Sequence, residues 1–192
     1  MVQGRPGVSR SETARQAILH ATAALIETRG YDGVSIERIA QQAGVGKQTI
    51  YRWYKSKSAI IAECLVEELL FADEFPVPQT DDLVDDLTTW LAGVFAFLQI
   101  DGNIQLLRSV LSAALETPEI VAQMGDRLGG GTGVPSRVEL AQRCAALSPD
   151  VSGELISQSL FGMIVVRAIA GGPFSDDDAA ATVRLIVAPH LN

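Results

Sequence analysis

Apolar side chains recur every three or four residues along most of the chain, a spacing that places them on one side of an α-helix. The first such stretch covers residues 11–29, with Ile18 and Leu25 among its apolar positions, and Gly30 follows it as a C-terminal stop signal. The pattern therefore predicts an amphipathic helix at the start of the chain.

Two short helices are predicted next, on either side of a Gly-Val-Gly turn at residues 44–46. Ser35 can cap the first of them, and Gly44 ends it. On the second, Ile50 and Tyr54 lie four residues apart and so share one face, which we expect to point inward. The side chains expected to point outward are Lys47, Gln48, Tyr51 and Arg52.

The remaining sequence also has helical periodicity, interrupted by Pro76-Val77-Pro78 and Asp101-Gly102. Thr80 with the acids after it, Thr117 before Pro118, and Ser175 before three aspartates are expected to cap helices. Gly129 to Gly133 predicts a mobile loop, since no Gly-Lys-Ser/Thr follows as a phosphate-binding motif would require. The expected helices cover residues 58–71, 83–98, 103–115, 151–169 and 175–188, with another after Thr117. The predicted fold is all-α, with about nine helices.

Charge divides the chain into two regions of opposite sign. The net charge is -8, yet residues 1–60 contain nine Lys and Arg against four Asp and Glu, whereas residues 61–192 contain six against nineteen. The protein's three lysines all fall within or just after the two short helices. Cations on one exposed helix face can displace counterions from phosphate, and Gln and Arg can pair with base edges in a major groove. This region predicts a DNA-binding helix-turn-helix.

Residues 11–61 resemble the DNA-binding domain of the TetR family of bacterial transcriptional regulators. The resemblance rests on Gly30-Tyr31, Val34-Ser35, Ile39-Ala40, Ala43-Gly44-Val45, Thr49-Ile50-Tyr51 and Lys57. It implies that Lys47, Gln48 and Tyr51 meet bases or their methyl groups, and that Ser35, Thr49, Trp53 and Lys57 meet phosphates. Gly46, Trp53 and Tyr54 depart from the family's usual residues, and Trp53 could equally pack against the first helix. The predicted DNA-binding residues are Ser35, Lys47, Gln48, Thr49, Tyr51, Arg52, Trp53 and Lys57.

Three segments follow from this interpretation: a flexible basic arm at residues 1–10, a helix-turn-helix domain at residues 11–56, and a helical effector-binding and dimerisation domain at residues 57–192. The arm, with Arg5 and Arg10, is either a frayed terminus or a phosphate or minor-groove contact. Residues 58–71 are expected to lead out of the DNA-binding domain as one continuous helix.

The resemblance also implies a ligand cavity among the middle helices and a four-helix dimer interface at the end of the chain. The expected ligand-binding residues are Trp90, Phe95, Arg108, Leu111, Met124, Phe161 and Val165. The expected interface residues are Leu155, Ser159, Leu160, Met163, Val183 and Val187. Arg108 and Arg167 lie in apolar stretches, so each should pair with an acid, lie at the dimer interface or face an acidic group of a ligand.

The sequence contains no spacing typical of a metal site, a cofactor loop or a catalytic residue set, so we expect neither metal, cofactor nor enzymatic activity. Cys64 and Cys144 are expected to be buried, reduced thiols. Without an apolar run of about 18 residues or a leader, the chain is expected to be cytoplasmic and not membrane-bound.

The predicted function is a homodimeric transcriptional regulator, a repressor that binds double-stranded DNA at a palindromic operator and is released by a small-molecule effector. A dimer is expected because one short helix contacts few base pairs, whereas a two-fold pair spaced by about 34 Å matches one DNA turn. The alternatives are a helical enzyme that carries a DNA-binding head and a nonspecific architectural DNA binder.

Overall fold

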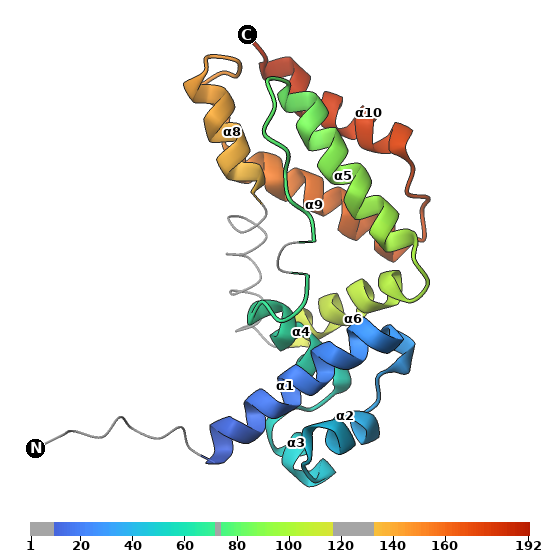
Figure 1. Ribbon diagram of the computed structural model, residues 1–192. Helices are drawn as coiled ribbons and strands as arrows, with labels where there is room; N and C mark the ends of the chain where they lie inside the picture. The colour runs from blue at the N-terminus through green and yellow to red at the C-terminus, as the bar shows by residue number, and fades with distance from the viewer. Residues whose placement is uncertain (1–9, 72–73, 117–132) are drawn as a thin grey trace, which may run out of the picture. The chain divides into compact units, whose positions relative to one another are not determined.

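The computed structural model describes residues 10–71, 74–116 and 133–192, which form nine α-helices and no β-strand (Figure 1). These residues divide into two compact units, residues 1–70 and 71–192. The predicted all-α fold is confirmed. Residues 1–9 of the basic arm, Met124, the helix start at Thr117 and most of the Gly129 to Gly133 loop lie outside the described residues.

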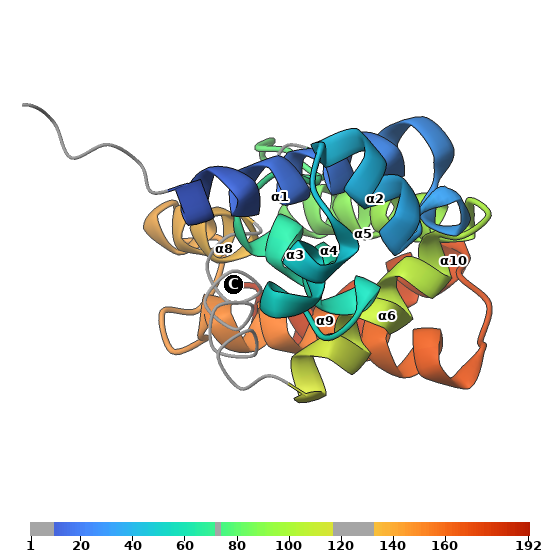
Figure 2. The ribbon, with the colours of Figure 1, turned by 90° about the horizontal axis from the view of Figure 1, so that it is seen from below.

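The first unit contains four helices. They are α1 (Arg10–Arg29), α2 (Ile36–Ala43), α3 (Lys47–Trp53) and α4 (Lys57–Val66). The long helix α1 packs against both α2 and α4, and its inner residues Ile18 and Leu19 are fully buried. Helices α2 and α3 lie at the lower end of this unit in Figure 1, and the view from below in Figure 2 shows them beside α1.

Helix α4 is shorter than predicted and lies inside the first unit. It ends at Val66 instead of residue 71, and Glu68 and Phe71 then adopt positive φ angles of 58° and 56°. Such left-handed conformations cannot continue a right-handed helix. The prediction of one continuous helix over residues 58–71 was therefore wrong. The first compact unit extends to Leu70 and includes α4.

The second unit contains five described helices. They are α5 (Leu83–Gln99), α6 (Asn103–Glu116), α8 (Val134–Arg143), α9 (Gly153–Ala170) and α10 (Asp176–Val187). Helix α5 packs against α10, and α8 packs against α9. Their apolar faces form one core, whose fully buried members include Leu87, Leu91, Phe95, Val138, Leu160 and Val183. Helix α8 was not predicted.

The helix starts in the second unit follow side-chain capping. Ser175 accepts a hydrogen bond from the backbone N–H of Asp178 at 3.2 Å, so the prediction of a capped acidic start for α10 is confirmed. Helix α5 differs from the prediction, since Asp82 and not Thr80 is its cap and accepts from the N–H of Asp85 at 3.0 Å. Thr80 is instead bonded to the buried Asp86.

Helix α9 is, among the described residues, the one helix long and apolar enough by composition to cross a membrane, although α5 and α6 would pass the same test if that bent pair were one span. Ile156, Leu160 and Ile164 of α9 lie in the core of the second unit, as expected of a core helix in a globular domain. Only 28% of the residues of this helix are buried, and Leu155, Val166 and Ile169 are among its exposed ones.

Candidate nucleic-acid interface

The turn between α2 and α3 is built from local capping interactions. Ser35 caps α2 by accepting a hydrogen bond from the N–H of Arg38 at 3.3 Å. Gly44 ends the helix at φ 66°, ψ 30°, a left-handed conformation that glycine adopts without a steric penalty. Gly46 begins α3 without a side-chain cap. These residues fix the direction in which α3 leaves the turn.

Helix α3 has one buried face and one exposed face, as predicted. Ile50 is fully buried and Tyr54 is 4% exposed. The side chains on the opposite face are exposed, namely Lys47, Gln48, Tyr51 and Arg52. Thr49 and Ser35 are half-buried at the edges of this surface. Their contacts with DNA remain predictions, but the outward orientation of the four polar side chains is confirmed.

Two aromatic residues next to this surface have unequal environments. Trp53 is 40% exposed, so it neither fills the interior nor projects fully into solvent, and both of its proposed roles stay open. Tyr54 is buried, and its hydroxyl has no hydrogen-bond partner among the described residues. Burial raises the pKa of the Tyr54 phenol well above its usual value. This tyrosine therefore acts as a neutral packing residue behind α3.

Lys57 joins the start of α4 to the turn before α2. Its Nζ donates to the backbone carbonyls of Tyr31 at 3.3 Å and Val34 at 3.2 Å, and lies 3.7 Å from the centre of the Tyr31 ring. The ammonium group thus holds the segment that precedes Ser35 while one of its three donors stays available. The phosphate contact expected for Lys57 remains a prediction.

An exposed ion pair links α2 to α3. Nζ of Lys47 lies 2.6 Å from Oε1 of Glu37. The hydrogen bond with Glu37 raises the pKa of Lys47, and the same bond lowers the pKa of Glu37. Glu37 was not predicted from the sequence to be part of this surface. The two residues lie ten positions apart across the turn, so only the folded arrangement of the two helices brings them together.

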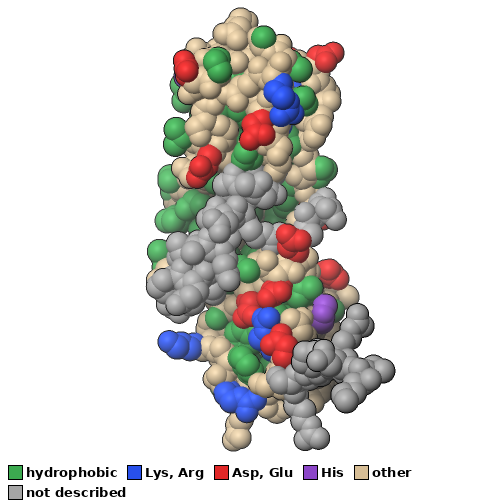
Figure 3. All heavy atoms as spheres, turned by 90° about the vertical axis from the view of Figure 1, so that its left-hand side faces the viewer, with side chains coloured by type: hydrophobic (Ala, Val, Ile, Leu, Met, Phe, Trp, Pro, Cys, Tyr) green, Lys and Arg blue, Asp and Glu red, His purple; other side chains and the backbone are tan. Residues whose placement is uncertain are grey.

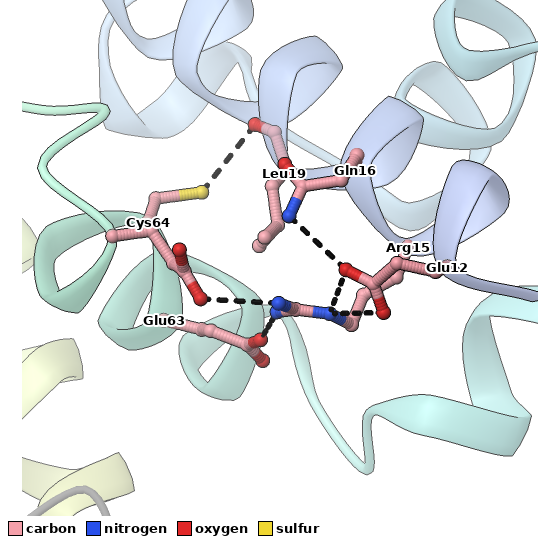
Figure 4. A network of polar contacts seen from close by, with 7 residues as sticks. Glu12, Arg15, Gln16, Leu19, Glu63 and Cys64 are labelled. Atoms are coloured by element: carbon pink, nitrogen blue, oxygen red, sulfur yellow. Dashed lines mark hydrogen bonds and ion pairs between the residues drawn. The ribbon is translucent and has the colours of Figure 1, made fainter. Parts of the chain in front are cut away.

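A second polar cluster, the Arg15 cluster, fastens α1 to α4 (Figure 4). Arg15 bonds Glu12 on its own helix at 3.1 Å, Glu67 at 3.1 Å and also Glu63. Burial would lower the pKa of Arg15, but the hydrogen bonds to Glu67 and Glu12 outweigh it and raise the pKa. In the same region the Cys64 thiol donates to the carbonyl of Leu19 at 3.4 Å. These contacts join α4 to α1, the helix against which α2 and α3 pack.

The predicted ligand-binding residues have different environments in the second unit. Trp90 and Phe95 are buried in its core, whereas Leu111, Phe161 and Val165 are half-buried. The rings of Trp90 and Phe161 meet edge to face, 5.8 Å apart, and Trp90 Nε1 is buried without a partner among the described residues. Their role in ligand binding remains a prediction.

The two arginines singled out from the sequence are both accounted for inside the second unit. Arg167 pairs with Asp178, with 2.8 Å between Nη1 and Oδ2, which agrees with the first of its three alternatives. Arg108 is exposed and its Nε donates to the backbone carbonyl of Ala168 at 2.6 Å. A carbonyl partner for Arg108 was not among the predicted alternatives.

Among the described residues, the most buried ion pair was also not predicted from the sequence. Arg137 and Asp86 are 3% and 0% exposed, with 2.5 Å between Nε and Oδ2. Thr80 completes the pair, since its hydroxyl donates to Asp86 at 2.8 Å and its carbonyl accepts from Arg137 at 2.9 Å. Burial alone would raise the pKa of Asp86, but the bonds from Arg137 and Thr80 outweigh it and lower the pKa.

Three of the six predicted interface residues, Leu160, Val183 and Val187, are fully buried in the core of the second unit and have no exposed surface in this chain. Leu155 and Ser159 are exposed and Met163 is half-buried. The periodicity correctly marked α9 and α10 as apolar, but it did not show which side faces the core.

The described part of the chain contains few other residues that could bind a metal or act as nucleophiles. Those residues contain no group of three or more His, Cys, Asp or Glu side chains that could hold a metal ion. Cys64 is buried, and burial raises the pKa of its thiol to about 12. Cys144 is exposed at the end of α8, so the expectation that both thiols are buried was wrong for this residue.

Two family profiles match the chain. Residues 18–64 match the profile described as bacterial regulatory proteins of the tetR family, and residues 77–186 match that of the tetracyclin repressor-like C-terminal domain. Among solved structures, the TetR family transcription regulator SCO0332 has a TM-score of 0.69 and 25% identity, covering 91% of this chain and 97% of that one.

Several regulators are similar to this chain in sequence. YdeS of Bacillus subtilis is 35% identical over 97 residues, which cover 50% of this chain and 48% of that regulator. AqdR of Rhodococcus erythropolis is 27% identical over 117 residues, 61% of this chain and 55% of AqdR. The matched part of the chain spans about half the length of these two relatives. Mb1581 of Mycobacterium bovis is 24% identical over 182 residues, 91% of this chain and 86% of that regulator.

A further solved structure has a similar fold. SmeT, described as the repressor of the Stenotrophomonas maltophilia multidrug efflux pump SmeDEF, has a TM-score of 0.53 and 20% identity, covering 96% of this chain and 93% of SmeT. At this level of identity the likeness concerns the fold alone. Each part of this chain thus matches a domain of TetR-type regulators, residues 18–64 the N-terminal one and residues 77–186 the C-terminal one.

Proposed function

Because this chain belongs to the TetR family of bacterial transcriptional regulators, we propose that it acts in the cytoplasm as a homodimeric repressor of transcription. Members of the family bind DNA, dimerise and bind small-molecule effectors. In this proposal the dimer binds a palindromic operator through α3, and an effector bound in the second unit releases it.

The observation that carries this proposal is the exposed face of α3. It presents two cations, an amide and a phenol on a helix whose opposite face is anchored by Ile50. An α-helix fits the major groove, where Gln pairs with adenine, Arg with guanine, and a phenol can meet a phosphate. The capped turn and the contacts of Lys57 hold this helix in place before DNA is bound.

The dimer proposal is supported by an exposed stripe on α9. Leu155 is 63% exposed, Val166 is 65% and Ile169 is 68%, and they are spaced so that they share one helix face. Ser159 and Gly162 lie between them on the same face and are also exposed. A Cβ built at Gly162 would meet nothing within 4 Å, so a second helix could approach closely there.

Helix α10 contributes exposed side chains to the same proposed interface. Leu185 is 78% exposed, and Ala181 and Arg184 of α10 and Ala188 directly after it are also exposed. Two copies of α9 and α10 related by a two-fold axis would bury these side chains in a self-complementary four-helix contact. This arrangement replaces Leu160, Val183 and Val187 in the predicted interface with residues on the outer faces of the same helices.

Effector release requires that the effector bind one state of the dimer better than the other. An effector that favours a dimer with the wrong spacing of its two α3 helices would weaken operator binding, and the operator would weaken effector binding by the same factor. An aromatic core around Trp90 and Phe161 suits an apolar ligand.

Footprinting of the promoter next to the gene for this chain tests the proposal, with and without a library of small apolar and acidic compounds. We expect protection of an inverted repeat and an affinity at least ~10³-fold above that for scrambled DNA. Equal affinity for both DNAs would indicate an architectural binder instead. A catalytic activity abolished by substitutions within residues 80–170 would favour the enzyme alternative.

Substitutions on α3 and α4 separate base recognition from phosphate contact. We expect Gln48→Ala or Arg52→Ala mainly to relax base preference, and Lys57→Ala to weaken binding to all sequences while lowering the salt slope by about one. Circular dichroism of the Lys57 variant should accompany the binding assay, because its contacts with Tyr31 and Val34 also stabilise the turn. A Gln48→Ala variant with unchanged preference removes Gln48 from the base-contact residues.

A further inference from the structure

The ion pair between Glu37 and Lys47 is exposed on the proposed DNA-binding surface. Glu37 lies in the first turn of α2, and Lys47 is the first residue of α3. Their side chains are 61% and 53% exposed, although 2.6 Å separates Nζ from Oε1. The pair therefore presents an adjoining donor and acceptor to whatever α3 contacts.

We propose that Glu37 and Lys47 together recognise one G·C base pair in each half of the operator, the ammonium group donating to guanine and the carboxylate accepting from cytosine. This inference rests on the proposed function, since it requires α3 to lie in a major groove. It adds Glu37 to the residues that determine sequence preference.

The groove edge of a G·C pair matches the ion pair atom by atom. Guanine O6 is an acceptor and the cytosine N4 amine is a donor. These two groups are bonded to each other across the base pair, so they lie about 2.9 Å apart. An ammonium above O6 and a carboxylate beside N4 can bind both groups while keeping their own ion pair. Neither charge is then left unpaired as water is displaced.

The order of donor and acceptor distinguishes the four base pairs. In the direction from Lys47 to Glu37, acceptor followed by donor occurs in G·C and in T·A, while C·G and A·T present the reverse order. Guanine adds N7 as a second acceptor for the ammonium group. In T·A the outer groups are instead a thymine methyl beside the ammonium and adenine N7, which repels the carboxylate. G·C is therefore preferred over the other three.

A purely structural role for Glu37 makes a different prediction. Gly46 provides no side-chain cap to α3, the first turn of α3 contains no acid, and Lys47 places a positive charge at the positive end of the helix dipole. Glu37 offsets that charge. If this were its whole role, replacing it would change the stability of the domain without changing which bases are preferred.

Selection from randomised double-stranded DNA by the full-length chain tests the inference. We expect Glu37→Gln to lose the preference for G·C at one position per half-site, by roughly tenfold, while the other positions keep theirs. Glu27→Gln, which removes the same charge from an exposed position on α1, is the matched control and should select the sequence that the unmodified chain selects.

The exchanged variant Glu37→Lys/Lys47→Glu provides the sharper measurement. It retains an ion pair between α2 and α3 but reverses the order of donor and acceptor, so the selected base pair should change from G·C to C·G. Thermal melting by circular dichroism reports whether each variant is folded. Because the exchanged variant retains an ion pair between α2 and α3, it can still be assayed if Glu37→Gln does not fold.

The outcomes separate this inference from the proposed function. If the unmodified chain selects no sequence, sequence-specific operator binding is wrong. If the unmodified chain selects a site and Glu37→Gln selects the same base at every position, the proposed function stands and the role of Glu37 in recognition is wrong. Retention of G·C by the exchanged variant leads to the same conclusion.

Discussion

The two units of this protein place their charges in different ways. Residues 1–70 contain nine Lys and Arg against seven Asp and Glu, and the cations of α3 are all exposed. Residues 71–192 contain six against sixteen, and one of the six, Arg137, is buried with Asp86. The first unit keeps the cations of α3 where a polyanion can reach them, whereas the second uses some of its few cations to join its own elements.

Their surfaces differ in the same sense. In the first unit, the large apolar side chains that are exposed are the aromatic Tyr51 and Trp53, on α3. In the second they are mostly aliphatic and concentrate on α9 and α10. On the face drawn in Figure 3, acidic and hydrophobic side chains are interspersed and do not gather in one patch. We therefore propose that the first unit recognises DNA through polar side chains and that the second unit associates with a second copy through apolar ones.

Removing the buried carboxylate of the second unit should have the largest effect. Asp86→Ala leaves Arg137 buried without its partner, so we expect a loss of about 3–5 kcal/mol in the free energy of unfolding. Urea denaturation measures it. Asp85→Ala is the control, since Asp85 is exposed and next in sequence. A loss equal to that of the control would show that the Asp86–Arg137 pair does not stabilise this unit.

A charge on the apolar stripe of α9 should disrupt association without unfolding either unit. Ile169→Glu places two carboxylates in a two-fold interface, and the loss of two buried Ile side chains alone should raise the dimer dissociation constant by about 100-fold. Sedimentation velocity measures this change. Ile100→Glu alters another exposed isoleucine, 59% exposed directly after α5, and should leave the dimer intact. Equal behaviour of the two variants would contradict the proposed interface.

The surface charges of the first unit should contribute less to stability than the buried pair of the second. Glu63→Gln weakens the Arg15 cluster, whose members are partly exposed, and we expect a loss of about 1–2 kcal/mol. Thermal denaturation compares it with Glu27→Gln, an exposed site on α1. If the two variants have the same melting temperature, the Arg15 cluster does not stabilise this unit.

The smallest expected effect is an acid dependence at the start of α10. The hydrogen bond from Arg167, with that from Ser175, lowers the pKa of Asp178 to about 2. Because this value is below that of an unfolded aspartate, about 3.9, the stabilisation is complete above pH ~4 and is lost as the pH falls towards 2. Asp178→Asn should therefore be less stable than the unmodified chain at neutral pH, and the difference should vanish near pH 2. Denaturation midpoints across this range measure it, and a difference that stays constant with pH would argue against the assignment.

Local features of the fold were predictable because their causes lie within a few residues. The Ser35 cap, the glycine after α2, and the buried Ile50 and Tyr54 all follow from interactions within one helical turn. The end of α4 was not predictable in this way. Its periodicity continues to residue 71, but the chain turns through left-handed conformations at Glu68 and Phe71 that no local signal marks.

Long-range pairing was the other feature that the sequence did not disclose. Nothing near Asp86 shows that Arg137 will reach it from 51 residues away, or that Glu63 will reach Arg15 from 48. The same applies to Glu37 and Lys47, which belong to separate helices. Charged residues at such distances have many possible partners, and only the packing of the helices selects one.

The sequence by itself determined where the helices form, how the helix-turn-helix is capped and which face of α3 is polar, because helix periodicity and capping act over three or four residues. The tertiary structure decided which ions are paired and which side of α9 and α10 is exposed. An apolar stripe indicates that a helix face will be buried, but whether its partner is the same chain or a second copy depends on how neighbouring helices fill the core. Leu160 and Val183 therefore lie in the core of the second unit, whereas Leu155, Val166 and Ile169 are exposed and form the proposed dimer interface.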